Sequence, residues 1–233
     1  MAAEPIQVWT LDLDAVTAPD AAIAPHLSDA ERARAAAFAL PIHRRRFLVS
    51  HGFLRAVLRD CLGEAPIEFG HSERGKPFLA GGAARGLHFS LSHSGPVAAC
   101  AVGPRDLGVD VECDREIPES AAIAARIFSA SGLARWQTEA PSRQLASLFA
   151  GWTRFEALAK AQGGGIVAPP EPIDHEGATD RWSAVVNRGR PWSVITMRPG
   201  QDTTLSLAIA GGPEACSVRA WQWPPESATL RDP

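Results

Sequence analysis

The sequence predicts an α+β protein built from two similar subdomains, each with one long helix packed on antiparallel strands. Two segments, 43–62 and 145–162, carry apolar residues at helical spacing, and both are followed by apolar runs of strand length. A short echo indicates a duplication: Gly-Lys-Pro-Phe at 75–78 matches Gly-Arg-Pro-Trp at 189–192, each after a long helix and before a predicted hairpin. A four-residue echo can also arise by chance. If the duplication is real, the groove between the halves is the natural place for a site.

The first half is expected over residues 1–104. Ser28 followed by Glu31 has the capping-box pattern that begins a helix, and Gly63 follows the first long helix as helix-ending glycines do. The alternating or continuous apolar runs in this half predict strands at 6–13, 87–91 and 97–102.

The second half is expected over residues 105–233. A mixed segment at 117–136 precedes the second long helix, which three glycines at 163–165 end. The strands predicted in this half are 107–112, 192–197, 204–210 and 217–223.

Composition excludes several classes of protein. The 233-residue chain is 45% hydrophobic and 21% charged, and no apolar stretch approaches the ~20 residues of a membrane span. The N-terminus lacks the basic region of a signal peptide, so we expect a cytoplasmic protein without a membrane anchor. The four cysteines form no CxxC pair, which argues against a zinc cluster and a disulfide scaffold.

Basic residues are distributed unevenly, although the net charge is only −3. Residues 32–59 contain seven arginines, two histidines and no acid, which favours an anionic partner. Only Lys76 and Lys160 are lysines among the 23 basic residues. Either these positions require a compact ammonium that a planar guanidinium cannot replace, or they are remnants of codon bias.

Asp110 and Glu112 alternate with two valines, so strand geometry places both carboxylates on one face, about 7 Å apart. One interpretation is the solvated face of an amphipathic strand, which we keep for the similarly spaced Asp12 and Asp14. The other is a site for a hard cation such as Mg²⁺, which prefers carboxylate and phosphate oxygens.

Glu156 falls on the apolar stripe of the second long helix, in line with Leu145, Phe149 and Trp152. Lys160 lies one turn further along the same face. A surface Glu–Lys pair is a common use of this spacing, but it does not explain a position on the apolar face. We therefore expect a functional carboxylate that is aimed inward.

The first long helix carries two sets of basic residues. Arg46 shares its face with Phe53 and Val57, so it needs an anion to offset its desolvation. We expect the other set to be solvated, and it comprises Arg44, His51, Arg55 and Arg59.

Ser92, His93 and Ser94 lie at the turn between two predicted strands. A hydroxyl beside an imidazole suits a nucleophile and its base, but no Gly-x-Ser-x-Gly elbow surrounds them. Small polar residues at a tight turn hold a phosphate equally well. An ordinary polar turn is the remaining interpretation.

Four motifs occur together in the order and spacing of one family. They are Gly-Lys-Pro at 75–77, Phe-Ser-Leu-Ser-His-Ser at 89–94, Gly-Val-Asp-Val-Glu at 108–112 and Trp-Thr-Arg-Phe-Glu-Ala-Leu-Ala-Lys-Ala-Gln-Gly-Gly-Gly at 152–165. Together with the Arg-rich helix, they resemble the surfactin-synthetase-type 4′-phosphopantetheinyl transferases of the holo-carrier-protein synthase superfamily over residues 28–166. Both lysines of the chain fall on motif positions.

The resemblance implies a cytoplasmic monomer with a pseudo-duplicated phosphopantetheinyl transferase fold, with coenzyme A and Mg²⁺, or Mn²⁺, between its halves. It implies transfer of the 4′-phosphopantetheine arm of coenzyme A to a serine of an apo acyl or peptidyl carrier protein, releasing 3′,5′-ADP. Neither nucleic acid nor a membrane is an expected partner. The first half would hold the coenzyme A phosphates, and the second half would supply the metal-binding carboxylates.

The resemblance also assigns roles to individual residues. The implied metal ligands are Asp110, Glu112 and Glu156. Glu156 and Lys160 are the implied catalytic residues, Glu156 as general base and Lys160 near the pyrophosphate. The residues implied to hold coenzyme A are Arg46, Lys76, Ser92, His93 and Lys160.

Two positions depart from the family pattern, and two alternatives stay open. Gly132 stands where the family often has Glu, and Phe155 where it commonly has Lys; we expect the Phe155 ring beside the metal site and not in it. The main alternative is a non-catalytic homologue that binds coenzyme A or a carrier protein. A Ser/His hydrolase is the second, although no third triad member is evident.

Overall fold

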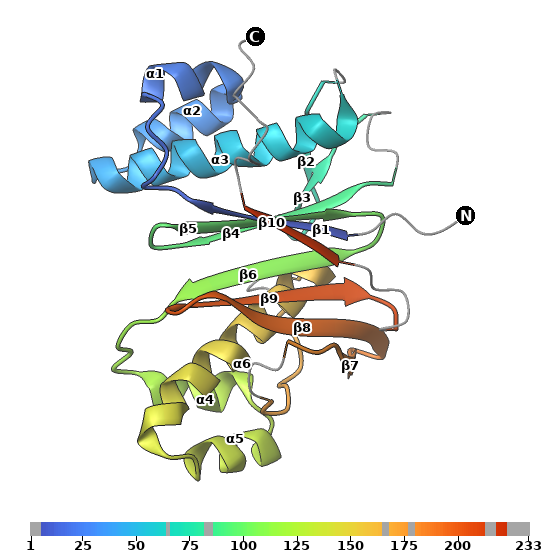
Figure 1. Cartoon of the computed structure of the whole chain (residues 1–233). Helices are drawn as coiled ribbons and strands as arrows, with labels where there is room; N and C mark the ends of the chain where they lie inside the picture. Colours follow the sequence, from blue (N-terminus) through green and yellow to red (C-terminus); the bar gives the residue numbers. More distant parts are fainter. Residues whose placement is uncertain are drawn as a thin grey trace.

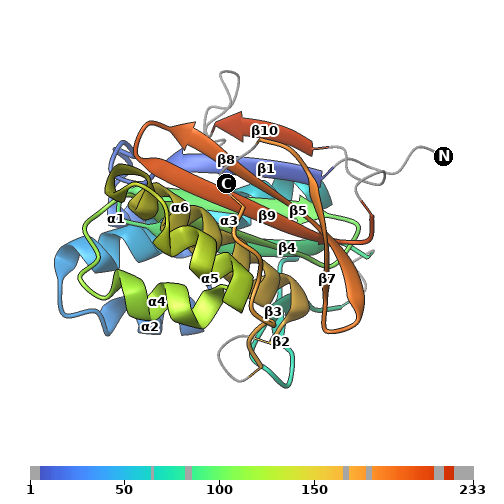
Figure 2. The same ribbon diagram turned by 90° about the horizontal axis from the view of Figure 1, so that it is seen from below.

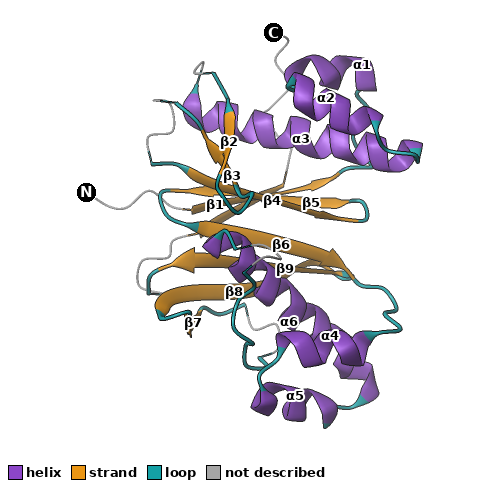
Figure 3. Cartoon of the chain, turned by 180° about the vertical axis from the view of Figure 1, so that it is seen from behind, coloured by secondary structure: helices purple, strands orange, loops and turns teal. Residues whose placement is uncertain are grey.

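The computed structural model describes residues 6–63, 66–81, 86–164, 168–176 and 180–212, together with the backbone of 218–222. The chain forms two stacked β-sheets with helices on the outside of each, in the order helix, sheet, sheet, helix (Figure 1). Seen from behind, the helices lie in two outer layers and the two sheets fill the middle (Figure 3). The predicted α+β class is confirmed.

The first half contains one long helix and several short elements. Ser28 caps α2 through the predicted capping box with Glu31, and Pro41 opens α3. Gly63 ends α3 with a positive φ of 67°. The elements are β1 (Ile6–Asp12), α1 (Asp20–Ile23), the 3₁₀ turn η1 (Ala24–His26), α2 (Asp29–Ala36), α3 (Pro41–Leu62), β2 (Phe69–His71), β3 (Pro77–Leu79), β4 (His88–Ser94) and β5 (Val97–Gly103).

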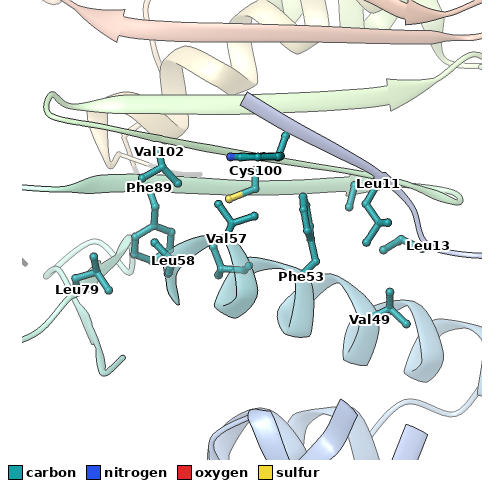
Figure 4. Close-up of a cluster of buried hydrophobic side chains, with 13 residues drawn as sticks. Leu11, Leu13, Val49, Phe53, Val57, Leu58, Leu79, Phe89, Cys100 and Val102 are labelled. Carbon is teal, nitrogen blue, oxygen red and sulfur yellow. The ribbon is translucent and has the colours of Figure 1, made fainter. Parts of the chain in front are cut away.

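The long helix α3 covers the outer face of the first sheet because its apolar residues recur every three or four positions. Val49, Phe53 and Val57 point from the helix toward the sheet, where they pack with Leu11 and Cys100 (Figure 4). Full burial of one such aliphatic or aromatic side chain contributes about 1.5–3 kcal/mol. This interface is therefore the main core of the first half.

The second half repeats the design with α6 as the long helix, and Figure 2 shows α4, α5 and α6 in front of the second sheet. α6 begins at Pro141, earlier than predicted, because proline suits the first helical turn. The segment predicted as mixed forms two short helices. The elements are β6 (Leu107–Cys113), α4 (Ser120–Ile127), α5 (Ala130–Gln137), α6 (Pro141–Gln162), β7 (Ser183–Asn187), β8 (Arg190–Gly200), β9 (Thr203–Ala210) and β10 (Val218–Gln222).

The two halves share one strand order, which confirms the prediction of two similar subdomains. In the first sheet β5 lies between β1 and β4, and in the second sheet β9 lies between β6 and β8, with every one of these pairings antiparallel. Each echoed glycine lies in a turn between antiparallel strands: Gly75 between β2 and β3 of the separate hairpin, and Gly189 between β7 and β8 of the second sheet. Both have a positive φ, which glycine adopts without strain.

The strand β10 joins the sheet of the first half, although it is the last described segment of the chain. It pairs in parallel with β1, from Ile6 opposite Val218 to Thr10 opposite Gln222. The short strands β2 and β3 form a separate antiparallel hairpin that periodicity did not predict. Within the described residues, no helix is both long and apolar enough to cross a membrane.

The strand β6 holds the two halves together. Its side chains Leu107, Val109 and Val111 enter the apolar layer between the sheets. On the opposite face is Gly108, where a Cβ atom would come within 2.2 Å of the Ala157 carbonyl oxygen. Because glycine has no side chain here, α6 lies directly on β6, and its polar residues come beside those of the strand.

Candidate active site

Asp110 is the most buried carboxylate of the predicted set, with a side chain only 7% exposed. Its Oδ1 atom accepts hydrogen bonds from Ser92 Oγ and Lys160 Nζ, both at 2.7 Å. Its Oδ2 atom is buried and has no hydrogen-bond partner among the described residues. Burial raises the pKa of Asp110, and the neighbouring Lys160 ammonium opposes that rise.

Glu112 is held at the same edge of the sheet by two donors. Ser94 Oγ donates to its Oε2 at 2.5 Å, and Arg115 Nη1 donates to the same atom at 2.6 Å. The alternation of β6 therefore does place both carboxylates away from the apolar layer between the sheets, as predicted.

Serines on alternate positions of β4 fix β6 in place. Besides the bonds from Ser92 and Ser94 to the two carboxylates, Ser90 Oγ accepts a bond from Val109 N at 3.1 Å. The Ser92 hydroxyl, which the resemblance assigned to the nucleotide, thus lies on Asp110. The period-two spacing of these serines was the sequence signal for this contact, and it was overlooked.

Glu156 on α6 is half-buried and completes an acidic group with Asp110 and Glu112. Burial raises the pKa of Glu156, followed by the negative charge of Asp110, while Lys160 opposes the rise. No set of three His, Cys, Asp or Glu side chains within the described residues is close enough to form a ready-made metal site. The donor chemistry nevertheless suits a hard divalent cation, since three carboxylates share one neighbourhood and Asp110 Oδ2 lacks a partner.

A pocket of about 800 Å³ opens beside Lys160, between α2, α3, the β2–β3 hairpin, β4 and the end of α6. Its walls include apolar side chains such as Leu54, Phe69, Phe89 and Leu91. Its basic lining residues are Arg34, His51, Arg55, His71, Arg74, Lys76, His93 and Lys160. An elongated ligand with apolar parts and several negative charges fits this lining.

His93 and Lys76 both line the pocket. Their assignment to the coenzyme A phosphates stays a prediction. Desolvation in the pocket wall lowers the pKa of His93, although the residue keeps solvent contact, and the charges of His51 and Lys160 lower it further. Burial also lowers the pKa of Lys76. Its Nζ atom donates to the carbonyl oxygens of Leu107 and Ala161, each at 3.1 Å, which leaves one of its three N–H bonds for a ligand.

Arg46 does not line this pocket. Its guanidinium binds Asp14 through both ends, with Nε–Oδ1 at 3.0 Å and Nη2–Oδ2 at 2.6 Å. Asp14 is therefore the anion that the position of Arg46 required, whereas the sequence had suggested a merely solvated aspartate. The Arg46 charge still reaches the pocket, since it contributes to lowering the pKa of His93.

The expectation that His51 and Arg55 are solvated is wrong. Both line the pocket, and Arg55 is only 8% exposed. Glu31 binds both, with Oε1 at 2.9 Å from His51 Nδ1 and Oε2 at 2.9 Å from Arg55 Nε. Burial raises the pKa of Glu31, but bonds from His51, Ser28 and Arg55 outweigh it and lower the value to about 2. Helical periodicity missed this because it cannot tell which stripe a neighbouring helix covers.

Neither of the two positions that depart from the family pattern, Phe155 and Gly132, lines the pocket. Phe155 is 4% exposed and lies in the core of the second half with Phe128 and Trp192. Gly132 lies under the segment leading to His175, whose backbone nitrogen would be 2.8 Å from a Cβ atom. A glutamate at position 132 would therefore require that segment to move.

Comparisons with known proteins identify the family of the chain. The family model described as the 4′-phosphopantetheinyl transferase superfamily matches residues 106–227. The chain is 34% identical over 210 residues to the 4′-phosphopantetheinyl transferase HetI of Nostoc sp. (strain PCC 7120), covering 88% of both proteins. It is 30% identical over 178 residues to a 4′-phosphopantetheinyl transferase of Bacillus subtilis, covering 76% of this chain and 68% of the relative.

The resemblance to surfactin-type enzymes is also confirmed. The chain is 29% identical over 157 residues to the 4′-phosphopantetheinyl transferase Sfp of Bacillus subtilis strain 168, covering 61% of this chain and 68% of Sfp. The family match spans more than half of the chain and contains the three carboxylates and Lys160. The chain therefore belongs to the 4′-phosphopantetheinyl transferase superfamily and is an enzyme of that type.

Proposed function

We propose that the chain transfers the 4′-phosphopantetheine arm of coenzyme A to a serine hydroxyl of an apo acyl or peptidyl carrier protein. The observation that carries this proposal is the junction of two features at Lys160: the pocket with its basic lining ends where the carboxylates of β6 and α6 begin. Such a junction suits a substrate whose phosphates bridge a nucleotide and a transferable arm.

The pocket residues bind and orient the coenzyme A end of the reaction. Lys76 and His93 contribute donors to its phosphates. Arg34 on α2 and Arg74 between β2 and β3, which the resemblance did not assign, add positive charge from two sides of the pocket. Lys160 lies at the inner end, where it can exchange its bond to Asp110 for a pyrophosphate oxygen. Charge-assisted bonds of this kind are short and strong, so several together fix the phosphorus in position.

Asp110, Glu112 and Glu156 would hold Mg²⁺, or Mn²⁺ in its place, which when bound would neutralise the pyrophosphate. Both cations that now bind these carboxylates, Lys160 and Arg115, must share them with the metal. The unpartnered Asp110 Oδ2 is the oxygen most ready to coordinate.

Glu156 is the proposed proton acceptor. The serine oxygen of the carrier forms a new bond to the phosphorus that bears the pantetheine arm, and the bond from that phosphorus to the leaving 3′,5′-ADP breaks. The serine proton passes to Glu156 directly or through water. In the metal-free protein, burial raises the pKa of Glu156 and makes it a stronger base than an exposed glutamate.

The test is mass spectrometry of several apo carrier proteins after incubation with the enzyme, coenzyme A and Mg²⁺. We expect a gain of one phosphopantetheine mass on at least one carrier, with the rate reduced at least about a hundredfold in Glu156→Gln and in Asp110→Asn. The matched control is Glu119→Gln, an exposed acid of the same half. Coenzyme A binding without modification of any carrier would instead establish the non-catalytic alternative.

A further inference from the structure

Glu31 places a negative charge in a pocket whose charged lining residues are mostly basic. Both of its carboxylate oxygens are engaged: Oε1 with His51 Nδ1, and Oε2 with Arg55 Nε and with Ser28 N at 2.7 Å. Its side chain is only 11% exposed. A buried carboxylate that repels an anionic ligand would weaken binding unless it improved the pocket in another way.

Arg55 also contacts the opposite wall of the pocket, although its Nη2 atom pairs with Glu31 Oε2 at 2.8 Å. Its Nη1 atom donates to the carbonyl oxygen of Ile67 at 3.2 Å, and its guanidinium lies 4.9 Å from the centre of the Phe69 ring. Ile67 and Phe69 lead into the β2–β3 hairpin. One guanidinium on α3 therefore connects α2, through Glu31, to the hairpin across the pocket.

The bond from Glu31 to His51 orders a second part of the same wall. The His51 ring stacks on the Phe47 ring with the centroids 4.0 Å apart. The Arg34 guanidinium lies 5.5 Å from the centre of the Phe47 ring. Because Nδ1 of His51 is committed to Glu31, the orientation of the imidazole in the pocket wall is defined. Arg34 on α2 contacts Phe47, the ring on which His51 stacks.

We propose that Glu31 is a positioning residue for the anionic co-substrate. It holds Arg55 and His51 so that α2 and the β2–β3 hairpin form two preassembled walls of the pocket. The inference rests on the proposed function in one respect, that coenzyme A occupies this pocket. Since Glu31 acts through other residues and touches no reacting group, its effect falls on binding of the co-substrate.

Glu31→Gln tests the proposal, because glutamine keeps the side-chain length and the capping-box geometry at Ser28 while removing the charge. We expect the Kd for coenzyme A, measured by titration calorimetry without carrier, to rise about tenfold, comparable to losing one charge-assisted bond. The KM for coenzyme A should rise similarly, with a much smaller fall in kcat. Amide hydrogen exchange should accelerate in residues 67–79.

The control is Asp29→Asn, because Asp29 lies in the same first turn of α2 but its side chain is 98% exposed and pairs with the neighbouring Arg32. It should change neither the affinity nor the exchange. The variant Arg55→Gln should weaken binding, and adding Glu31→Gln to it should cost little more, because the two residues act as one unit.

An unchanged Kd together with unchanged exchange in Glu31→Gln would overturn the positioning role. If the wild type bound no coenzyme A, the proposed function would fail instead. The hydrogen-exchange comparison at 67–79 would then still decide whether Glu31 and Arg55 brace the two walls.

Discussion

The strands β1 and β6 occupy equivalent places in the two halves, yet their helix-facing positions differ in character. Val8 of β1 and Val109 of β6 both lie in the layer between the sheets. The next residue faces the helix, and it is Trp9 in the first half but Asp110 in the second. The first half uses this face as hydrophobic core, whereas the second half uses it for acids.

A buried acid at this strand position needs partners, which the second half provides. A buried carboxylate is unfavourable unless it is paired, and Ser92 with Lys160 supplies that pairing for Asp110. Gly108 lets α6 approach closely enough for Lys160 to reach the strand. The comparison teaches that the same strand position in a duplicated fold can contribute to the hydrophobic core in one half and carry paired acids in the other.

Among the variants considered, we expect the largest loss of stability from Phe155→Lys, which places a charge in the core of the second half. Because Phe155 lies in the second core and not in the pocket, a lysine there buries a charge and leaves a cavity. We expect a loss of about 3–5 kcal/mol in the free energy of unfolding, measured with urea. This loss of stability would mask any effect of the lysine on the rate of transfer.

The control for that variant is Phe155→Leu, which keeps the position apolar and should cost less than half as much. A Phe155→Lys protein as stable as the wild type would contradict the core assignment.

Glu31 in the first half and Glu156 in the second half should contribute to stability with opposite dependence on pH. The pKa of Glu31 is lowered to about 2, so its stabilising contribution is present above about pH 4.5 and is lost as the pH falls toward 2. We expect Glu31→Gln to lose at most about 3 kcal/mol at pH 7, less what solvent screening removes. Near pH 2 the variant and the wild type should be equally stable.

The pH dependence expected for Glu156 is opposite to that of Glu31, because the pKa of Glu156 is raised. Its contribution to folding is present below the unfolded value near 4 and is lost as the pH rises through the folded-state pKa. Glu156→Gln should therefore be at least as stable as the wild type at pH 7. Urea unfolding of both variants in chelator between pH 3 and 8 measures how the stability difference from the wild type changes with pH. If this difference changed in the same direction for both variants, the predicted opposite roles of the two carboxylates would be refuted.

Gly108→Ala tests whether α6 must lie close to β6. The added methyl group would overlap the backbone of α6 and should cost about 1–3 kcal/mol. Transfer activity should fall by more than stability explains, because α6 would carry Lys160 and Glu156 away from β6. The matched control is Gly200→Ala, where the added Cβ atom would lie 3.8 Å from the Thr203 hydroxyl. Similar activity in both variants would show that close approach of α6 is not needed.

Local patterns predicted most of the elements that position the site. The capping box at Ser28, the alternation through Asp110 and the glycines after each long helix are readable because backbone geometry sets their spacing. The β2–β3 hairpin escaped prediction because its strands have only three residues each, too few for a period.

The site was predictable in part for the same reason. The strand period places Asp110 and Glu112 on one face of β6, and the helix period places Glu156 and Lys160 on one face of α6, which singled these residues out. Glu31 was recognised only as a helix cap, because its partners are 20 and 24 residues away on another helix.

The amino-acid sequence by itself determined the α+β class, the duplicated plan and the faces on which the acids lie, since each of these follows from short-range periodicity. Only the tertiary structure decided which face of each helix is covered. That choice put Arg46 on Asp14, His51 and Arg55 in the pocket wall, and Phe155 in the core. It also placed β10 beside β1. The physical reason is that a side chain's environment depends on segments distant in the chain, and packing them against one another sets the partners that no local period encodes.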